Sequence, residues 1–466
     1  MRNKQFYNRQ HIFILSRKIK LSAVLLLVTL LQQIILSIQG MITPNISLSL
    51  GTVWSAAAVT YSVLSYRNNL HRITDDGIKI RLGIFFSKTF TIPFRNILTL
   101  TFRQSIFQRL AGAVDVISDT PARFTRFGDM SLCLKIRSAL AVKKILSAPK
   151  GKLYRCDSVR ILLMSAFRSN PASGLLILAP VVYRLGNISG FTLRRIRKML
   201  AIPMTAKEIS DTAELAAQIM VLCWSVSLVV RFLGYSNFSS HSQGEFIVSS
   251  RGFFTRILSF SRRSAISAVV LDSTLLMHLF GLCSVSLFTI GSEKKSADKN
   301  MILPSDTKSS AHHMLHDLFS IRGKEKIVSR PKKIFSYIRM PLCFLGADSI
   351  FLLYIYHRFG ISACTILSLS VPPILWWILF RYAAYRESHI GICENCFCVC
   401  TFSKMTLRHY YIPFEKIQKF RITQNFFQKK SGTCNFCIYV YSEKKICIKV
   451  RQLPKDFVKN MAATQL

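Results

Sequence analysis

The stretch "TIPFRNILTLTFRQSIFQRLAG", Thr91–Gly112, returns near the other end of the chain as "YIPFEKIQKFRITQNFFQKKSG", Tyr411–Gly432. Aligned without gaps at an offset of 320, residues 92–112 and 412–432 are identical at eight of 21 positions. Unrelated segments share far fewer residues, so the chain contains an internal repeat. The identical residues of the first copy are Ile92, Pro93, Phe94, Ile97, Gln104, Phe107, Gln108 and Gly112.

A weaker middle copy lies at an offset of 169, where Ile266, Leu279 and Gly281 match Ile97, Leu110 and Gly112. Upstream of each copy, a short segment reads as two strands joined by a turn. In the first of these, the turn falls at Asp76-Gly77 and the second strand alternates apolar and polar residues. The three segments are Arg72–Gly83, Ile247–Ile257 and Gly391–Cys400.

Downstream of each copy, a short amphipathic helix with Ser or Asp near its start is expected to close the unit. These three segments are Leu153–Phe167, Leu303–Phe319 and Leu453–Ala462. Pro93 has no N–H to donate and should begin or edge a strand, while Gly112 suits a backbone with positive φ or a close approach. Each unit is therefore predicted to be a small β-sandwich or barrel closed by one helix.

The composition favours a membrane protein. Half of the 466 residues are hydrophobic, and 63 basic against 22 acidic residues give a formal net charge of +41. Such a charge suits nucleic acid or an anionic membrane surface, and the long apolar runs favour the membrane. No nucleic-acid-binding motif is recognised, so nucleic acid is not expected as a partner.

Three pairs of apolar runs precede the three units, and each is predicted to cross the bilayer as a helical hairpin. Leu21–Tyr66 contains no charged residue or histidine, and the third pair is Met340–Tyr356 with Gly360–Phe380. The second pair, Ser169–Tyr183 with Leu215–Val230, is shorter, and the basic segment Leu193–Glu208 between its two runs opposes the positive-inside rule. The alternatives are that this segment lies on the membrane surface as an interfacial helix, or that the first run does not cross. A hairpin is preferred because it keeps all units on one side.

The segment "YRNNLHRITDDGIKIRLGIFFSKTFTIPFRNILTLTFRQSIFQRLAGAVDV" resembles the bacterial pleckstrin-homology-like (PH-like) domain of YdbS/YdbT-type membrane proteins. Members of the YdbT type combine pairs of membrane helices with repeats of this domain. The resemblance implies a multi-domain α+β membrane protein, in which each repeat has two packed antiparallel sheets and a C-terminal helix. It implies no reaction and no catalytic residues.

The expected organisation alternates helical and PH-like parts. Residues 1–66 hold the N-terminal segment and hairpin 1, 169–233 hairpin 2, and 335–381 hairpin 3. The PH-like domains are expected at 67–168, 234–334 and 382–466, the middle one being degenerate because it lacks the Ile-Pro-Phe triplet.

The cysteines are the residues that most strongly suggest a chemical site. Cys393-x-x-Cys396 and Cys434-x-x-Cys437 could supply four thiolates to zinc. The opposing interpretation is that these are small buried hydrophobes, since Cys434 and Cys437 align with strand residues whose side chains point to opposite faces. His312 and His313 lie in the second expected closing helix, and His278, His389 and His409 are scattered. No catalytic, cofactor or metal site is therefore predicted.

The function expected from the sequence is a non-enzymatic interaction platform in a bacterial plasma membrane. Its multi-pass chain would hold the soluble domains in the cytoplasm, where thiols stay reduced. Partners would be anionic lipid headgroups or unidentified proteins, with homo- and hetero-oligomers left open, and a role in envelope stress or assembly would fit. The alternative is a transporter or permeation component that uses Asp348, a carboxylate at membrane depth.

Overall fold

The computed structural model describes most of the chain, and every structural statement below concerns this described part. The predicted spans before residue 44 and Ser169–Tyr183, the basic segment Leu193–Glu208 and the third closing helix fall wholly or mostly outside it. The described residues are 7–15, 44–83, 86–120, 130–146, 148–169, 206–290, 300–319, 321, 325–332, 334–359, 371–403, 406–441 and 446–455.

Contacts divide the chain into two compact units, which are described separately. Unit 1 comprises 1–152, 241–250 and 254–265, and unit 2 comprises 153–240, 251–253 and 266–466. The division falls inside the middle repeat rather than at a repeat boundary.

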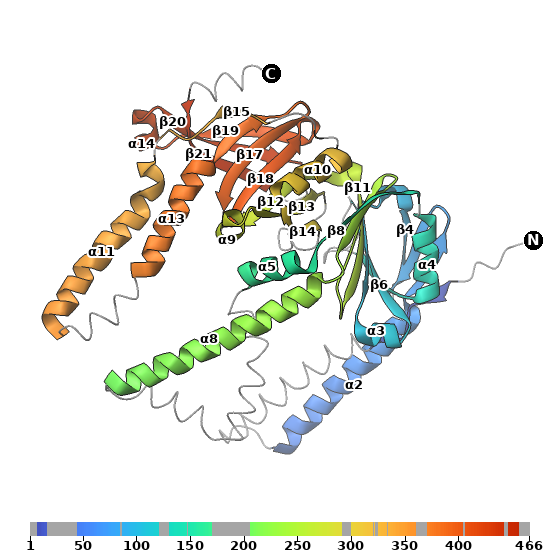
Figure 1. Cartoon of the computed structure of the whole chain (residues 1–466). Helices are drawn as coiled ribbons and strands as arrows, with labels where there is room; N and C mark the ends of the chain where they lie inside the picture. The colour runs from blue at the N-terminus through green and yellow to red at the C-terminus, as the bar shows by residue number, and fades with distance from the viewer. Residues whose placement is uncertain are drawn as a thin grey trace, which may run out of the picture. The chain divides into compact units, whose positions relative to one another are not determined.

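Unit 1 begins with a four-stranded antiparallel sheet in the order β1-β2-β3-β4, of which β4 is labelled in Figure 1. The helix α2 (Pro44–Asn68) leads directly into β2. The predicted hairpin within Arg72–Gly83 is confirmed, because β2 and β3 pair across a tight turn. The strands are β1 (Asn8–Arg9), β2 (Leu70–Thr74), β3 (Gly77–Leu82) and β4 (Lys88–Pro93).

The second sheet of unit 1 starts with three strands of the first repeat and continues into strands of the second, in the order β7-β6-β5-β11-β10-β9-β8. A one-turn helix, α3 (Ile106–Leu110), joins β5 to β6, and α4 (Ile136–Ile145) follows β7. The strands are β5 (Thr99–Gln104), β6 (Ala113–Asp119), β7 (Met130–Lys135), β8 (Lys150–Arg155), β9 (Ser239–Gln243), β10 (Phe246–Arg251) and β11 (Arg256–Arg262).

One hydrophobic core joins the two sheets of unit 1. Alternate residues of β3, β5 and β6 turn inward, as a period of two requires, and Phe246, Val248 and Phe260 from the second repeat complete the same core. Two repeats therefore share buried residues.

Unit 2 repeats this plan. Its large antiparallel sheet has the order β14-β13-β12-β18-β17-β16-β15, and a separate sheet has the order β19-β20-β21. The strands are β12 (Ile266–Thr274), β13 (Leu282–Thr289), β14 (Met301–Thr307), β15 (Lys326–Ser329), β16 (His389–Ile392), β17 (Cys396–Ser403), β18 (Thr406–Pro413), β19 (Ile417–Thr423), β20 (Thr433–Val440) and β21 (Ile446–Pro454).

The helices of unit 2 are of two kinds. The short helices α9 (Leu275–Leu279) and α14 (Phe426–Lys430) occupy the same place in their repeats as α3 does in the first. The long helices α11 (Phe335–Phe359) and α13 (Val371–Glu387) pack against each other, with the rings of Phe344 and Trp377 5.5 Å apart (Figure 1). The remaining helices are α5 (Ser158–Arg168), α8 (Ala206–Tyr235) and α10 (Lys308–Phe319).

Two predicted alignments within the repeat are wrong. Ile247–Ile257 covers β10 and part of β11, whereas its supposed counterpart Arg72–Gly83 covers β2 and β3, so the match was one strand out of step. The counterpart of the closing helix α10 is α4, not the helix within Leu153–Phe167. That segment forms β8 and α5, and β8 pairs with β9 as an edge strand of the next sheet.

Six paired membrane helices are not supported by the described residues. Two described helices have an 18-residue stretch long and apolar enough to cross a bilayer, Gln218–Tyr235 in α8 and Tyr337–Tyr354 in α11. Both stretches are mainly exposed on their unit, as helices facing lipid would be.

Candidate functional site

The sheet formed by β16, β17 and β18 has two chemically different faces. Side chains alternate along each strand, so Phe397 and Val399 of β17 enter the hydrophobic core with Ile412 of β18. The intervening residues Cys396, Cys398 and Cys400 point to the other face. Opposite them in the sheet lie His389 on β16 and His409 and Tyr411 on β18.

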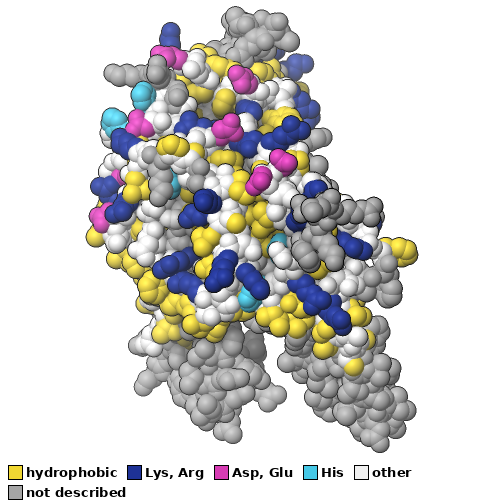
Figure 2. Space-filling view, turned by 90° about the vertical axis from the view of Figure 1, so that its right-hand side faces the viewer, with side chains coloured by type: hydrophobic (Ala, Val, Ile, Leu, Met, Phe, Trp, Pro, Cys, Tyr) yellow, Lys and Arg dark blue, Asp and Glu magenta, His cyan; other side chains and the backbone are white. Residues whose placement is uncertain are grey.

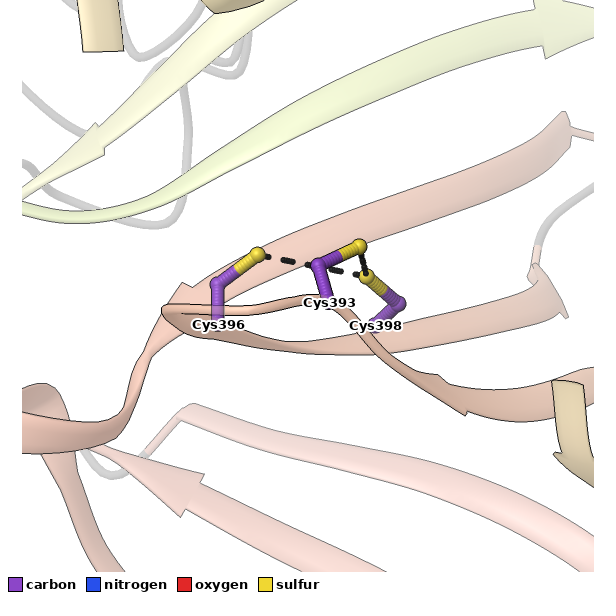
Figure 3. Close-up of side chains that lie close together, drawn as sticks. All are labelled: Cys393, Cys396 and Cys398. Atoms are coloured by element: carbon purple, nitrogen blue, oxygen red, sulfur yellow. Dashed lines mark hydrogen bonds between the residues drawn. The ribbon is translucent and has the colours of Figure 1, made fainter. Parts of the chain in front are cut away.

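Three cysteines meet at one end of this face (Figure 3). Cys393 precedes the tight turn between β16 and β17, and its N–H donates to the Cys396 carbonyl at 2.9 Å. The turn brings the Cys393 Sγ to 2.8 Å from the Cys398 Sγ, which is 4.0 Å from the Cys396 Sγ. All three residues are buried.

The three sulfur atoms share a proton network. Hydrogen bonds from the Cys396 and Cys398 thiols lower the pKa of Cys393, and the hydrogen bonds to Cys393 raise the pKa of both partners. The cluster thus favours one thiolate held by two thiols.

A cavity of about 380 Å³ between α10 and the sheet reaches one of the three cysteines, Cys393. Cys393 and Tyr411 line it from the sheet, and His312 lines it from α10. The rings of His312 and Tyr411 lie 6.1 Å apart, edge to face. An imidazole therefore lines the same cavity as Cys393 of the thiol cluster.

A second polar group lies farther along the same face. The His389 Nε2 lies 2.9 Å from a Glu325 carboxylate oxygen, and the His409 Nε2 lies 3.2 Å from the Cys400 Sγ. Burial alone would lower the pKa of His389, but the hydrogen bond and charge of Glu325 raise it overall. Burial lowers the pKa of His409 to about 4 and keeps the Cys400 thiol protonated by raising its pKa.

These two groups differ in what they can do. Glu325, His389 and His409 could together contact a metal ion, yet His389 is already held by Glu325, beside the His409 imidazole whose pKa is lowered by burial. The three cysteines offer thiolates, the ligands that Zn²⁺ and other soft metals prefer.

The three repeats of the chain match a known protein family. A sequence model of the bacterial PH domain matches the chain three times, over residues 18–150, 176–313 and 342–458. The chain belongs to the bacterial PH domain family. No curated protein and no solved structure matches it.

The thiol cluster is therefore a local feature of the third bacterial PH repeat, and it differs from the zinc set that the sequence suggests. Cys434 lies in the hydrophobic core, and Cys437 faces Lys449 across the β20–β21 pair. The structure does not bring the four suggested sulfur atoms together, and among the described residues Cys398 is the one that joins Cys393 and Cys396. The signal was present as Cys396-x-Cys398, a spacing that places both thiols on one face of a strand.

Other residues singled out in the sequence lie elsewhere. His389 and His409 are not scattered, since their rings lie 5.7 Å apart on adjoining parts of the sheet. His278 lies on α9, and Asp348 lies part-way along α11, partly exposed. No observation joins Asp348 to the thiol cluster.

Proposed function

We propose that the chain is a multi-pass protein of a bacterial plasma membrane, and that its three PH-like repeats form a non-enzymatic platform for protein or lipid contacts in the cytoplasm. The alternation of helices and PH-like sheets supports this assignment. Each family match takes in a helical segment and the strands that follow it.

One topological observation carries the proposal. In each repeat, a long segment whose described part is mainly helical lies between the first two strands of one sheet, which are β1 and β2, β8 and β9, or β15 and β16. The inserted segments are 10–69, 156–238 and 330–388. Because neighbouring strands hold both ends of each insertion together, a segment that leaves for the bilayer must return to the same side, which requires an even number of crossings.

The charge distribution agrees with a surface that faces anionic lipid. Figure 2 shows Lys and Arg side chains spread over one face of the described surface, with fewer acidic side chains between them. Basic residues beside a membrane contribute about 1 kcal/mol each to attraction by anionic headgroups, and they also keep their loops on the cytoplasmic side.

Reporter insertion tests the topology. A fluorescent protein inserted within 121–129, 291–299 or 442–445 should fold and fluoresce, because these insertions stay in the cytoplasm. Alkaline phosphatase inserted within 360–370 should be active, because that connection reaches the periplasm. Active phosphatase within 291–299 would overturn the proposal, and an insertion near residue 200 decides whether the second helical segment crosses as a pair.

A further inference from the structure

The thiol cluster of the third repeat has the residues of a metal site, and its Cys393 lines a cavity. Three buried sulfur atoms come from one turn and one strand, and all lie within 4.8 Å of one another. Ligand atoms held about 2.3 Å from a tetrahedral zinc ion lie about 3.8 Å apart. The Cys396 and Cys398 sulfur atoms are already 4.0 Å apart, and the Cys393 sulfur needs to withdraw from Cys398 by about 1 Å.

We propose that Cys393, Cys396 and Cys398 bind a zinc ion, with His312 of α10 as the fourth ligand. His312 enters the same cavity as Cys393, and its helix closes the preceding repeat. The ion would therefore tie the β16–β17 turn of the third repeat to α10 of the second. A structural zinc ion with four protein ligands has this fixing role and needs no open coordination position.

Metal content of the full chain, purified in detergent, tests the site. Wild type should contain one zinc per chain, and Cys396→Ser or Cys398→Ser should lose it. Cys447→Ser is the matched control, because Cys447 is an exposed cysteine of the same repeat and should leave the zinc content unchanged.

A second measurement begins with the wild type, so its main result needs no variant to fold. Cobalt added to metal-stripped wild type should give an intense thiolate-to-cobalt absorption band, and the band should weaken in His312→Ala. Wild type that holds no zinc above the buffer level and gives no such band would overturn the site, and the cysteines would then be buried hydrophobes.

A different observation concerns how the repeats join. Strand β11 of the second repeat pairs with β5 of the first, and β18 of the third pairs with β12 of the second, both antiparallel. At the first junction Ser259 lies opposite Thr101, and at the second Tyr410 lies opposite Val270. Subtracting 169 from the second-repeat residues and 320 from the third-repeat residue converts both pairs to the same two positions of the first repeat. The two junctions therefore have the same register.

The same two edges recur at the ends of the array. Among the described residues, β4 has β3 as its only strand neighbour, and β19 has only β20. Strand β4 is the counterpart of β11 and β18, and β19 is the counterpart of β5 and β12. The first and last repeats thus present complementary edges.

The exposure of side chains on β19 and β4 indicates that a further strand could pair with each of these two edges. Phe102 is 7% exposed and Leu271 is 5% exposed, but Ile422 at the same position of β19 is 42% exposed. On the other edge, Phe260 and Tyr411 are buried, whereas Thr91 at the same position of β4 is exposed. A long exposed edge with a large apolar side chain is a template for another strand.

We propose that β19 of one copy of this chain pairs with β4 of a second copy, in the register of the internal junctions. Ile422 then lies opposite Thr89, and Phe420 opposite Thr91. The basic residues of the two edges do not oppose one another, because Lys419 faces Ile92, Arg421 faces Phe90, and Lys88 faces Thr423. The result is a head-to-tail assembly in which the repeat array continues from copy to copy.

This proposal rests on the platform function and names a second copy of the chain as the partner. Its test does not depend on the membrane topology. Two differently tagged copies are expressed together, one carrying Thr89→Cys and the other Ile422→Cys. Oxidation in isolated membranes should link the two tags. Arg421→Cys in place of Ile422→Cys is the matched control, because a shift of one residue puts the thiol on the other face of the sheet and should abolish the link.

Size in detergent gives the second readout. Wild type should change from monomers to dimers and larger species as its concentration rises, and Ile422→Lys should shift this change to at least tenfold higher concentration. Wild type that stays monomeric at every concentration, with no linkage in membranes above the level of the control, would overturn head-to-tail pairing.

Discussion

A single glycine follows the short helix of each repeat. Gly112, Gly281 and Gly432 have φ values of +67°, +66° and +65°, so the positive φ predicted from the recurring glycine is confirmed. A Cβ added at any of the three would meet no atom within 4 Å. Glycine is therefore needed at this position for its backbone conformation, and not because a side chain would lack space.

Gly112→Ala should therefore destabilise the chain by about 1 kcal/mol through backbone strain alone. Gly112→Asn should cost less, since Asn adopts this conformation more readily. Thermal unfolding of the full chain in detergent measures both. Gly234→Ala in α8 is the control with equal space and an ordinary helical backbone, and it should be neutral or stabilising; equal losses at Gly112 and Gly234 would contradict the argument.

His409 makes stability depend on pH. Burial lowers the pKa of His409 to about 4, below the value near 6.5 of an unfolded chain. Between these values the unfolded state binds the extra proton, so this group lowers stability as pH falls from about 6.5 towards 4, by about 3 kcal/mol in all.

His409→Gln should flatten the loss of stability between pH 7 and pH 5, as measured by denaturant unfolding at several pH values. His316→Gln is the control, because His316 is an exposed histidine on α10 and should leave the slope unchanged. A slope unchanged in His409→Gln would show that the imidazole is accessible to protons in the folded chain.

At the scale of elements, two glutamines shared by the first and third copies serve one hydrogen-bond pattern. The Gln108 side chain accepts from the Ser105 N–H at 2.8 Å and donates to Asp115 at 2.8 Å. The Gln428 side chain accepts from the Asn425 N–H at 2.9 Å and donates to Asn435 at 2.9 Å. Each glutamine starts the short helix and ties it to the next strand.

Gln428→Ala should cost about 1–3 kcal/mol, because it leaves the buried Asn435 amide and the Asn425 N–H without their partner. Unfolding of the full chain by urea measures the loss. Lys429→Ala on the same short helix is exposed and should change stability little. Equal effects of the two changes would mean that the hydrogen bonds of Gln428 do not contribute to the stability of the chain.

Elements with strong local signals could be predicted from the sequence. The hairpin at Arg72–Gly83 carries alternation and turn residues, and the repeat identities fall on residues with fixed roles, such as Gln108 and Gly112. The edge strands β1 and β15 have only two and four residues, too short for any period to show. The sequence predicts a helix over Leu153–Phe167 and misses the end of strand β8, because its partner β9 comes 84 residues later, counting from Arg155 to Ser239.

Only part of the candidate site can be predicted from the sequence, because the rest depends on contacts between distant segments. Cys393-x-x-Cys396 is a local pattern, and it points to the turn that begins the cluster. His312 shares the cavity with Cys393 only because β16 and β17, which begin 70 residues after the end of α10, counting from Phe319 to His389, join the same sheet as the strands that precede α10. Long-range pairing of this kind has no signature within a short window of sequence.

At the scale of the whole molecule, strand pairing rather than chain connection should hold the repeats together. Within unit 2, Ala268 and Val270 of the second repeat lie in the core of the third, and β12 pairs with β18 over six residue pairs. A fragment of 382–466 alone would lack both of these residues and β15. Its core would be incomplete, so the third repeat should not fold well by itself.

Cutting the connection between α11 and α13 tests this directly. A protease site inserted within 360–370 should be cleaved in detergent, and the two pieces should still elute together, since β12–β18, β15–β16 and the α11–α13 contact remain. Val270→Asp, which puts a charge into the shared core, should make the cleaved pieces separate at a lower urea concentration. If the cleaved wild-type pieces separate without denaturant, the repeats are joined by their linkers, and the shared sheet contributes little to the assembly of the chain.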